Sequence, residues 1–152
     1  MTDSSLSEQD SVELGELGQS LGFLIRLAQV RVYDQFYERF GESDLRPGEF
    51  SILWAIHLNP GIRQGLLAQA LHIKAAHMTK IIRRFEDNGV VERHIPEDDR
   101  RSVHLSLTKA GTKLALEQQT AFFGPDCYNR HDMTDEDAAM LAHLLRKYMG
   151  MS

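Results

Sequence analysis

Apolar side chains recur every three or four residues along most of the chain, which is the spacing of one helix face. Between residues 12 and 40 this pattern predicts a single helix about 40 Å long, ended by Gly41. One small domain does not cover a helix of that length, so the pattern also indicates a partner subunit. The same spacing predicts a second helix with Pro47 in its first turn, and further helices at 63–70, 74–88, 109–123 and 134–149.

The period of the pattern changes to two after Asn88 and Gly89. Apolar and polar residues alternate over 91–95 and again over 103–107, with the six residues PEDDRR between them. This alternation predicts a β-hairpin rather than another helix. Thr108 and Thr134 are predicted N-caps of the last two helices, because their hydroxyls can accept hydrogen bonds from backbone N–H groups.

The composition is that of one globular domain, with 152 residues of which 42% are apolar and 26% charged. No apolar run approaches the roughly 18 residues of a membrane span. The acidic, polar first residues are unlike a secretory signal, so we expect a cytoplasmic protein with no membrane partner. The single cysteine, Cys127, excludes an intrachain disulfide and a multi-cysteine zinc site, and we expect it to be inert.

The net charge of −5 argues against a nucleic-acid partner until its distribution is considered. Residues 1–20 hold five acids and no Lys or Arg, so the remainder is formally neutral. We expect residues 1–11 to be a disordered acidic tail. Residues 60–85, in contrast, hold five basic residues and no acid. Because electric field is a local property, this stretch is either a solvated helix face or a nucleic-acid surface.

Two short helices joined by a tight turn, at 63–70 and 74–88, predict a helix-turn-helix, and the hairpin that follows predicts a winged helix. The second helix has one apolar face and one polar face. On the polar face, small side chains allow contact with thymine methyl groups, His and Lys reach base edges, and Arg binds phosphates. The predicted DNA contacts of this segment are Lys74, Ala76, His77, Thr79, Lys80, Arg83 and Arg84.

Residues 45–111 resemble the winged-helix core of the MarR family of bacterial transcriptional regulators. The segments 12–44 and 112–152 are similar to the family's dimerisation helices, so the resemblance implies one domain over 12–152. It implies a mainly α fold with a small β-hairpin wing (α+β). The matching parts are GLLAQALHIKAAHMTKIIRRFEDNGVVER and the wing pattern Asp99-x-Arg101-x-x-x-Leu105-x-Leu107-Thr108-x-x-Gly111.

The resemblance also implies a homodimer on double-stranded operator DNA, with half-sites about 10 base pairs apart. It assigns Arg101 as the probe of the minor groove, Asp99 as the carboxylate that orients it, and Arg100 as a second contact. A narrow A·T-rich minor groove has an enhanced negative potential, which favours an inserted arginine. Ala76 and His77 depart from the Ser and Thr that the family often has, so the base preference of relatives does not transfer.

The charged hairpin has two alternative interpretations, a metal site and a catalytic loop. A metal site would need His94, Asp98, Asp99 and His104 to converge beside arginines that repel a cation, and no HExxH spacing occurs. We therefore expect no metal or other cofactor, and both histidines on the exposed side of their strands. No GxSxG motif, Gly-rich phosphate loop or nucleophile–base pair occurs, so we predict that the chain is not an enzyme.

Many members of the family bind small aromatic acids between the dimerisation helices and the DNA-binding lobe. By this resemblance we predict a repressor that an aromatic acid or its thioester releases, with rings that pack the ligand and Arg26 neutralising its anion. Alternatively, these residues pack the dimer. The other function left open is a dimeric ligand-binding or interaction protein that does not bind DNA. The predicted effector residues are Phe23, Arg26, Val30, Tyr33, Tyr37, Trp54 and His57.

Overall fold

The computed structural model of the chain describes residues 12–41, 45–124 and 130–151, so the predicted acidic tail and Cys127 lie outside the described residues. Three strands, β1 (Ile62–Arg63), β2 (Val91–His94) and β3 (His104–Leu107), form an antiparallel sheet in the order β1-β3-β2. The predicted mainly α fold with a small hairpin wing is confirmed. The helices are η1 (Gly15–Gln19, a 3-10 helix), α1 (Leu21–Phe40), α2 (Glu49–Leu58), α3 (Gln64–Ala70), α4 (Ala75–Asp87), α5 (Lys109–Phe123) and α6 (Asp135–Tyr148).

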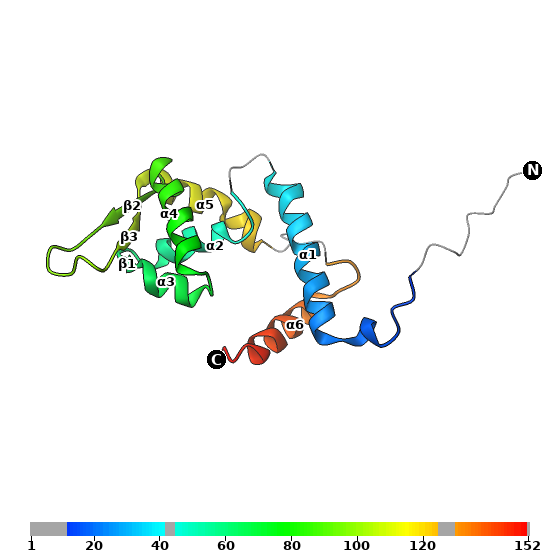
Figure 1. Cartoon of the computed structure of the whole chain (residues 1–152). Helices are drawn as coiled ribbons and strands as arrows, with labels where there is room; N and C mark the ends of the chain where they lie inside the picture. The colour runs from blue at the N-terminus through cyan, green and yellow to red at the C-terminus, as the bar shows by residue number, and fades with distance from the viewer. Residues whose placement is uncertain (1–11, 42–44, 125–129, 152) are drawn as a thin grey trace, which may run out of the picture.

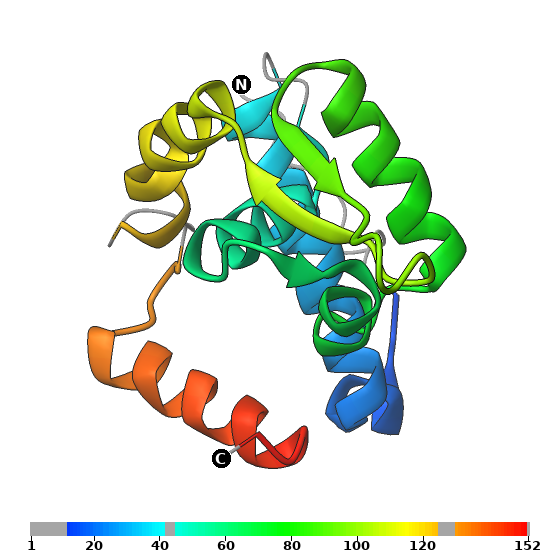
Figure 2. The same cartoon turned by 90° about the vertical axis from the view of Figure 1, so that its left-hand side faces the viewer.

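The described elements are arranged in two parts (Figure 1). Helices α2 to α5 gather around the small sheet in a lobe, and the β2–β3 hairpin extends from this lobe as a wing. Helix α6 and the first turns of α1 lie on the side away from the wing (Figure 1). Seen from the wing side, α6 stands apart from the lobe (Figure 2), in keeping with its having no buried residue.

The core of the lobe is built from the apolar helix faces that the sequence pattern predicts. On α4 the side chains of Met78, Ile82 and Phe85 are buried, and the last turns of α1 add Phe36 and Phe40. Burial of each such side chain stabilises the fold by about 1.5–3 kcal/mol. The same core contains Ile52, Leu53 and Ile56 from α2, and Val91 and Leu105 from the hairpin strands.

The N-terminal helix is shorter than predicted. Residues 15–19 form a 3-10 helix, Ser20 is extended with φ −68° and ψ 120°, and α1 begins only at Leu21. Gly15 has a φ of +50°, and glycine disfavours a continuous helix because it loses the most backbone freedom on ordering. None of the helices in the described ranges is long and apolar enough to cross a membrane.

The second helix also begins later than predicted. Gly48 has a φ of +85°, which a right-handed helix excludes, so α2 starts at Glu49 and Pro47 precedes it. The Glu49 carboxylate accepts a hydrogen bond from the Arg46 backbone N–H at 2.8 Å, which satisfies a donor next to the helix start. The expectation that Pro47 lies in the first turn was therefore wrong.

The sequence predicted the hairpin but not the third strand of the sheet. β2 pairs with β3 in the register Val91↔Leu107, and His94 lies opposite His104. The segment Ile62–Arg63 then pairs with the other edge of β3, so residue 63 is strand and not the start of a helix as predicted. Two residues are too few to display a period, which is why the pattern did not reveal β1.

Both predicted N-caps are confirmed. The Thr108 hydroxyl accepts a hydrogen bond from the Gly111 backbone N–H at 3.0 Å and donates to the Gly89 carbonyl at 2.6 Å, so it joins α5 to the turn before β2. A Cβ atom at residue 111 would lie 2.0 Å from the Val90 carbonyl oxygen, so only glycine fits there. Thr134 forms a capping box with Asp137 at the start of α6.

Candidate nucleic-acid interface

The outer face of α4 presents most of the side chains predicted to contact DNA. Ala76, His77 and Lys80 are exposed, and so is Arg83 one turn further along. Lys74, the N-cap residue, is exposed at the start of the helix. Because the opposite face of α4 is buried in the core, these groups lie on the solvent-exposed side of the helix.

Thr79 is held by the other helix of the helix-turn-helix. The Gln64 side-chain nitrogen on α3 donates to the Thr79 hydroxyl oxygen at 3.0 Å, and this hydroxyl donates to the Ala75 carbonyl at 3.0 Å. Since the hydroxyl proton is already engaged, the methyl group is the part of Thr79 best able to contact an outside molecule. The sequence did not indicate Gln64, because a contact between two helices is not visible in the periodicity of either.

Arg84 is held inside the lobe rather than presented outward. Its guanidinium forms an ion pair with Glu49 at the start of α2, and the Glu49 side chain is buried. The guanidinium also lies 5.5 Å from the centre of the Phe85 ring. Sequence reasoning grouped Arg84 with Arg83 as a phosphate contact and missed Glu49, because an acid in the first turn of a helix is ordinarily solvated.

The tip of the wing is shaped by Asp99. Its carboxylate accepts a hydrogen bond from the Arg101 backbone N–H at 3.2 Å, and its carbonyl accepts one from the Ser102 backbone N–H at 3.1 Å. Hydrogen bonding from the Ser102 side chain, then from the Arg101 N–H, lowers the pKa of the Asp99 carboxyl, and the charge of Arg63 lowers it further. Asp99 thus holds the backbone at residue 101, while Arg100 and Arg101 have exposed side chains.

The two histidines of the hairpin differ in their surroundings. His94 is exposed, as predicted, but His104 is half-buried, which corrects the prediction for that residue. The His104 Nδ1 atom lies 2.9 Å from the Gly61 carbonyl oxygen and its Nε2 atom 3.3 Å from the Ser102 hydroxyl, so it joins the base of the wing to the turn after α2. Within the described ranges, no three His, Cys, Asp or Glu residues are placed to hold a metal ion.

The structure does not bring the predicted effector residues together. A cavity of about 1080 Å³ lies between α1, α2 and α4, and of the seven predicted residues only Tyr33 and Tyr37 line it. Phe23, Arg26 and Val30 lie outside the cavity; the Arg26 guanidinium is 5.8 Å from the centre of the Phe23 ring.

The last two predicted effector residues belong to a separate aromatic cluster on α2 and α5. The ring of Trp54 lies 5.2 Å from that of His57 and 5.1 Å from that of Phe123. Neither Trp54 nor His57 lines the cavity, because their side of α2 packs on α5 rather than on α4.

A helix-turn-helix with a basic outer face, followed by a hairpin that a third strand anchors, defines the winged-helix class of DNA-binding proteins. The comparisons with known proteins agree with this class. Residues 45–103 match the model of the MarR family. The chain is 26% identical over 144 residues to a protein of Thauera aromatica named as a transcriptional regulatory protein for the hcr operon, covering 93% of this chain and 87% of that protein.

Solved structures extend the likeness over most of the chain. A MarR variant from E. coli in complex with operator DNA superposes with a TM-score of 0.75 at 26% identity, covering 91% of this chain and 99% of that one. BpsR of Bordetella bronchiseptica shares the fold, with a TM-score of 0.72 at 23% identity and coverage of 87% and 94%. Residues 45–103 thus form a winged-helix domain of the MarR type, and the named relatives of the chain are transcriptional regulators rather than enzymes.

Proposed function

We propose that the chain binds a pseudo-palindromic DNA operator as a homodimer and represses transcription until a small anionic ligand releases it. The observation that carries the DNA-binding part is the division of the basic residues into two groups. Arg84 and Arg93 are neutralised by Glu49 and Glu86 within the lobe. The exposed cations of α4 and the wing form no ion pair among the described residues: Lys74, Lys80, Arg83, Arg100 and Arg101.

On the DNA, α4 lies in the major groove. His77 and Lys80 reach base edges, while Ala76 and the methyl group of Thr79 contact thymine methyl groups. Lys74 and Arg83 bind phosphates and set the position of the helix. On the wing, Arg101 enters the adjacent minor groove, held there by the turn that Asp99 stabilises, and Arg100 is a second contact.

The dimer is proposed from apolar surface that one chain leaves uncovered. On α6 the side chains of Met140, Leu141 and Leu144 are 58%, 48% and 52% exposed, and on α1 those of Leu21 and Leu24 are 55% and 46% exposed. Contiguous apolar surface of this kind marks an interface. A second copy would cover both helices and place two α4 helices about one DNA turn apart.

The ligand is proposed to occupy the cavity between α1, α2 and α4. Tyr33 and Tyr37 offer rings for an aromatic acid or its thioester, and the lining cations Arg46 and Lys80 suit its anionic group. DNA binding of BpsR is regulated by 6-hydroxynicotinic acid, which supports an aromatic carboxylate. In this proposal α1 belongs to the dimer part and α4 to the DNA-binding lobe. A ligand that binds more tightly at one spacing of α1 and α4 therefore shifts the population of dimers toward that spacing.

The test of DNA binding is fluorescence anisotropy with a duplex taken from upstream of the chain's own coding sequence. Wild type should bind with an affinity that falls steeply with salt. Arg101→Ala should weaken binding about tenfold or more, because a groove-reading arginine contributes about 1–3 kcal/mol. Sedimentation should show that the variant is still a dimer.

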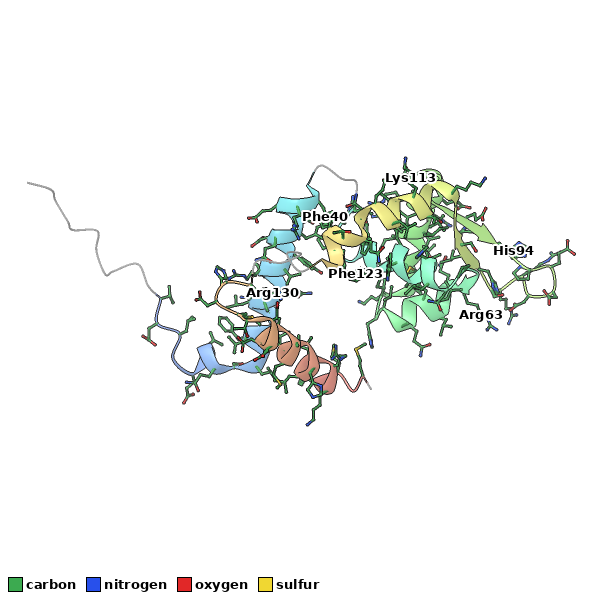
Figure 3. All side chains as sticks on the ribbon, turned by 180° about the vertical axis from the view of Figure 1, so that it is seen from behind. Phe40, Arg63, His94, Lys113, Phe123 and Arg130 are labelled. Carbon is green, nitrogen blue, oxygen red and sulfur yellow. The ribbon has the colours of Figure 1, made fainter. Side chains whose placement is uncertain are left out.

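The matched control is Lys113→Ala, which removes the same charge from α5; Lys113 forms an ion pair with Glu117 and lies away from the wing (Figure 3). It should bind as wild type does. Wild-type protein that binds no duplex would favour the ligand-binding protein without DNA binding. Equal affinities of Arg101→Ala and Lys113→Ala would remove the wing from the mechanism.

A further inference from the structure

A second, smaller groove lies between the wing and the start of α3, separate from the cavity beside α1. Its volume is about 650 Å³, and it is lined on one side by Arg63 and Gln64 and on the other by Arg101 and Ser102. Arg63 was not among the predicted DNA contacts. Arg63 and Arg101 line the same groove.

The identity of residue 63 is not explained by the local fold. Arg63 is the N-cap of α3, a position where Ser, Thr, Asp or Asn is favoured, and it makes no capping hydrogen bond. Its side chain is exposed. Figure 3 places Arg63 at the end of the lobe that bears His94 and the wing. Arg63 therefore gives α3 no side-chain cap.

The backbone holds Arg63 in a fixed relation to the wing. Residue 63 pairs with His104 in the β1–β3 register. On either side, the Gly61 N–H donates to the Leu105 carbonyl and the Gln64 N–H to the Val103 carbonyl, each at 2.8 Å. Because these bonds join the two sides of the groove, Arg63 and Arg101 extend from one rigid base.

The charge of Arg63 is also available to an outside group. Among the described residues no carboxylate forms an ion pair with it, in contrast to Arg84 and Arg93. Its field does reach the wing, since it contributes to the lowered pKa of Asp99. The groove therefore combines two cationic side chains with no resident anion in the described part of the chain.

We propose that Arg63 binds a DNA backbone phosphate on the strand that runs between the grooves occupied by α4 and the wing. This inference rests on the proposed DNA binding. If α4 lies in the major groove and Arg101 in the adjacent minor groove, the strand separating the two grooves must cross between them. Arg63 lies there, beside Gln64, which contacts Thr79 of α4. The guanidinium can take two phosphate oxygens at once, which adds affinity and position without reading sequence.

The test compares Arg63→Ala, Arg63→Lys and Lys113→Ala by anisotropy across a salt series, on the upstream duplex and on an unrelated duplex of equal length. Arg63→Ala should lose several-fold in affinity by the same factor on both duplexes. Its slope of log Kd against log salt should be smaller than that of wild type by about 0.9 per protomer contact. Arg63→Lys should restore the slope, because it restores the charge, and Lys113→Ala should match wild type.

A second measurement locates the contact. Neutral methylphosphonate linkages are placed one at a time in the upstream duplex, and one of them should weaken wild type while leaving Arg63→Ala unchanged. Unfolding midpoints of the variants show whether each is folded. If wild type binds but Arg63→Ala behaves like Lys113→Ala, the phosphate contact is wrong and the proposed function stands. If wild type binds no duplex, the proposed function fails first.

Discussion

Two adjacent arginines on α4 show how one residue step changes the use of a side chain. A helix turns about 100° per residue, so Arg83 lies on the exposed face while Arg84 lies toward α2 and the buried Glu49. Arg84 thereby ties α4 to the start of α2. The ion pair of Arg84 with Glu49 positions α4, while the preceding Arg83 stays exposed to an outside partner.

Substitution of Arg84 should change the stability of the fold, whereas substitution of Arg83 should change the affinity for DNA. Arg84→Ala leaves the Glu49 carboxylate buried without its cation and should lower the free energy of unfolding by about 1–3 kcal/mol, less than for a fully buried pair because 31% of the Arg84 side chain is exposed. Arg83→Ala should stay within about 0.5 kcal/mol of wild type yet weaken DNA binding. Urea unfolding at one fixed protein concentration, paired with anisotropy, measures both. Equal losses of stability in the two variants would contradict these separate roles of Arg83 and Arg84.

At the scale of elements, α6 is a helix stabilised mainly by its own ends. It buries no residue, but Thr134 and Asp137 form a capping box, acids occupy its first turn, and Arg146 and Lys147 lie in its last turn. Both arrangements complement the helix dipole. The sequence shows all of these features, which is why this helix was predicted almost to the residue.

The cap of α6 should make the helix sensitive to acid. Hydrogen bonds from the Thr134 backbone N–H and hydroxyl lower the pKa of Asp137 below its ordinary 3.8. A carboxyl whose pKa is lowered on folding contributes stability that is complete above the ordinary pKa and is lost as pH falls through the lowered one. Helix content and dimer fraction, measured by circular dichroism and sedimentation, should therefore fall below about pH 4 in wild type.

Asp137→Asn should weaken α6 already at neutral pH and flatten this acid dependence. The matched control is Glu136→Gln, which removes a charge from the same turn without touching the capping box. If both variants show the acid dependence of wild type, Asp137 does not govern the stability of α6.

At the scale of the whole molecule, the cavity between α1, α2 and α4 joins the part proposed for dimerisation to the part proposed for DNA binding. Its walls come from segments as far apart in the sequence as Tyr33 and Asp87. A ligand there would contact α1 and α4 together, which a site on either helix alone could not do. The proposed regulation therefore depends on tertiary structure.

Tyr37→Ala should reduce release of DNA by aromatic carboxylates without weakening DNA binding in their absence. The measurement is anisotropy of the protein–DNA complex titrated with benzoate or with 6-hydroxynicotinate. The loss of one ring contact should raise the concentration for half release about tenfold, as removal of roughly 1.4 kcal/mol does. Arg26→Ala, outside the cavity, is the comparison. Loss of release in Arg26→Ala alone would place the ligand beside Phe23, Arg26 and Val30 of α1, outside the cavity.

The sequence by itself determined the features that depend on local backbone geometry. The helical and alternating periods located α4, α5, α6 and the hairpin, and the chemistry of Thr108 and Thr134 located two helix starts, because a cap is decided within four residues. Only the tertiary structure decided which side chains meet: Arg84 with Glu49, Gln64 with Thr79, Arg63 with the wing groove, and Tyr33 without Trp54. These pairings join segments that fold against one another, and no period along the chain records the distance between two segments.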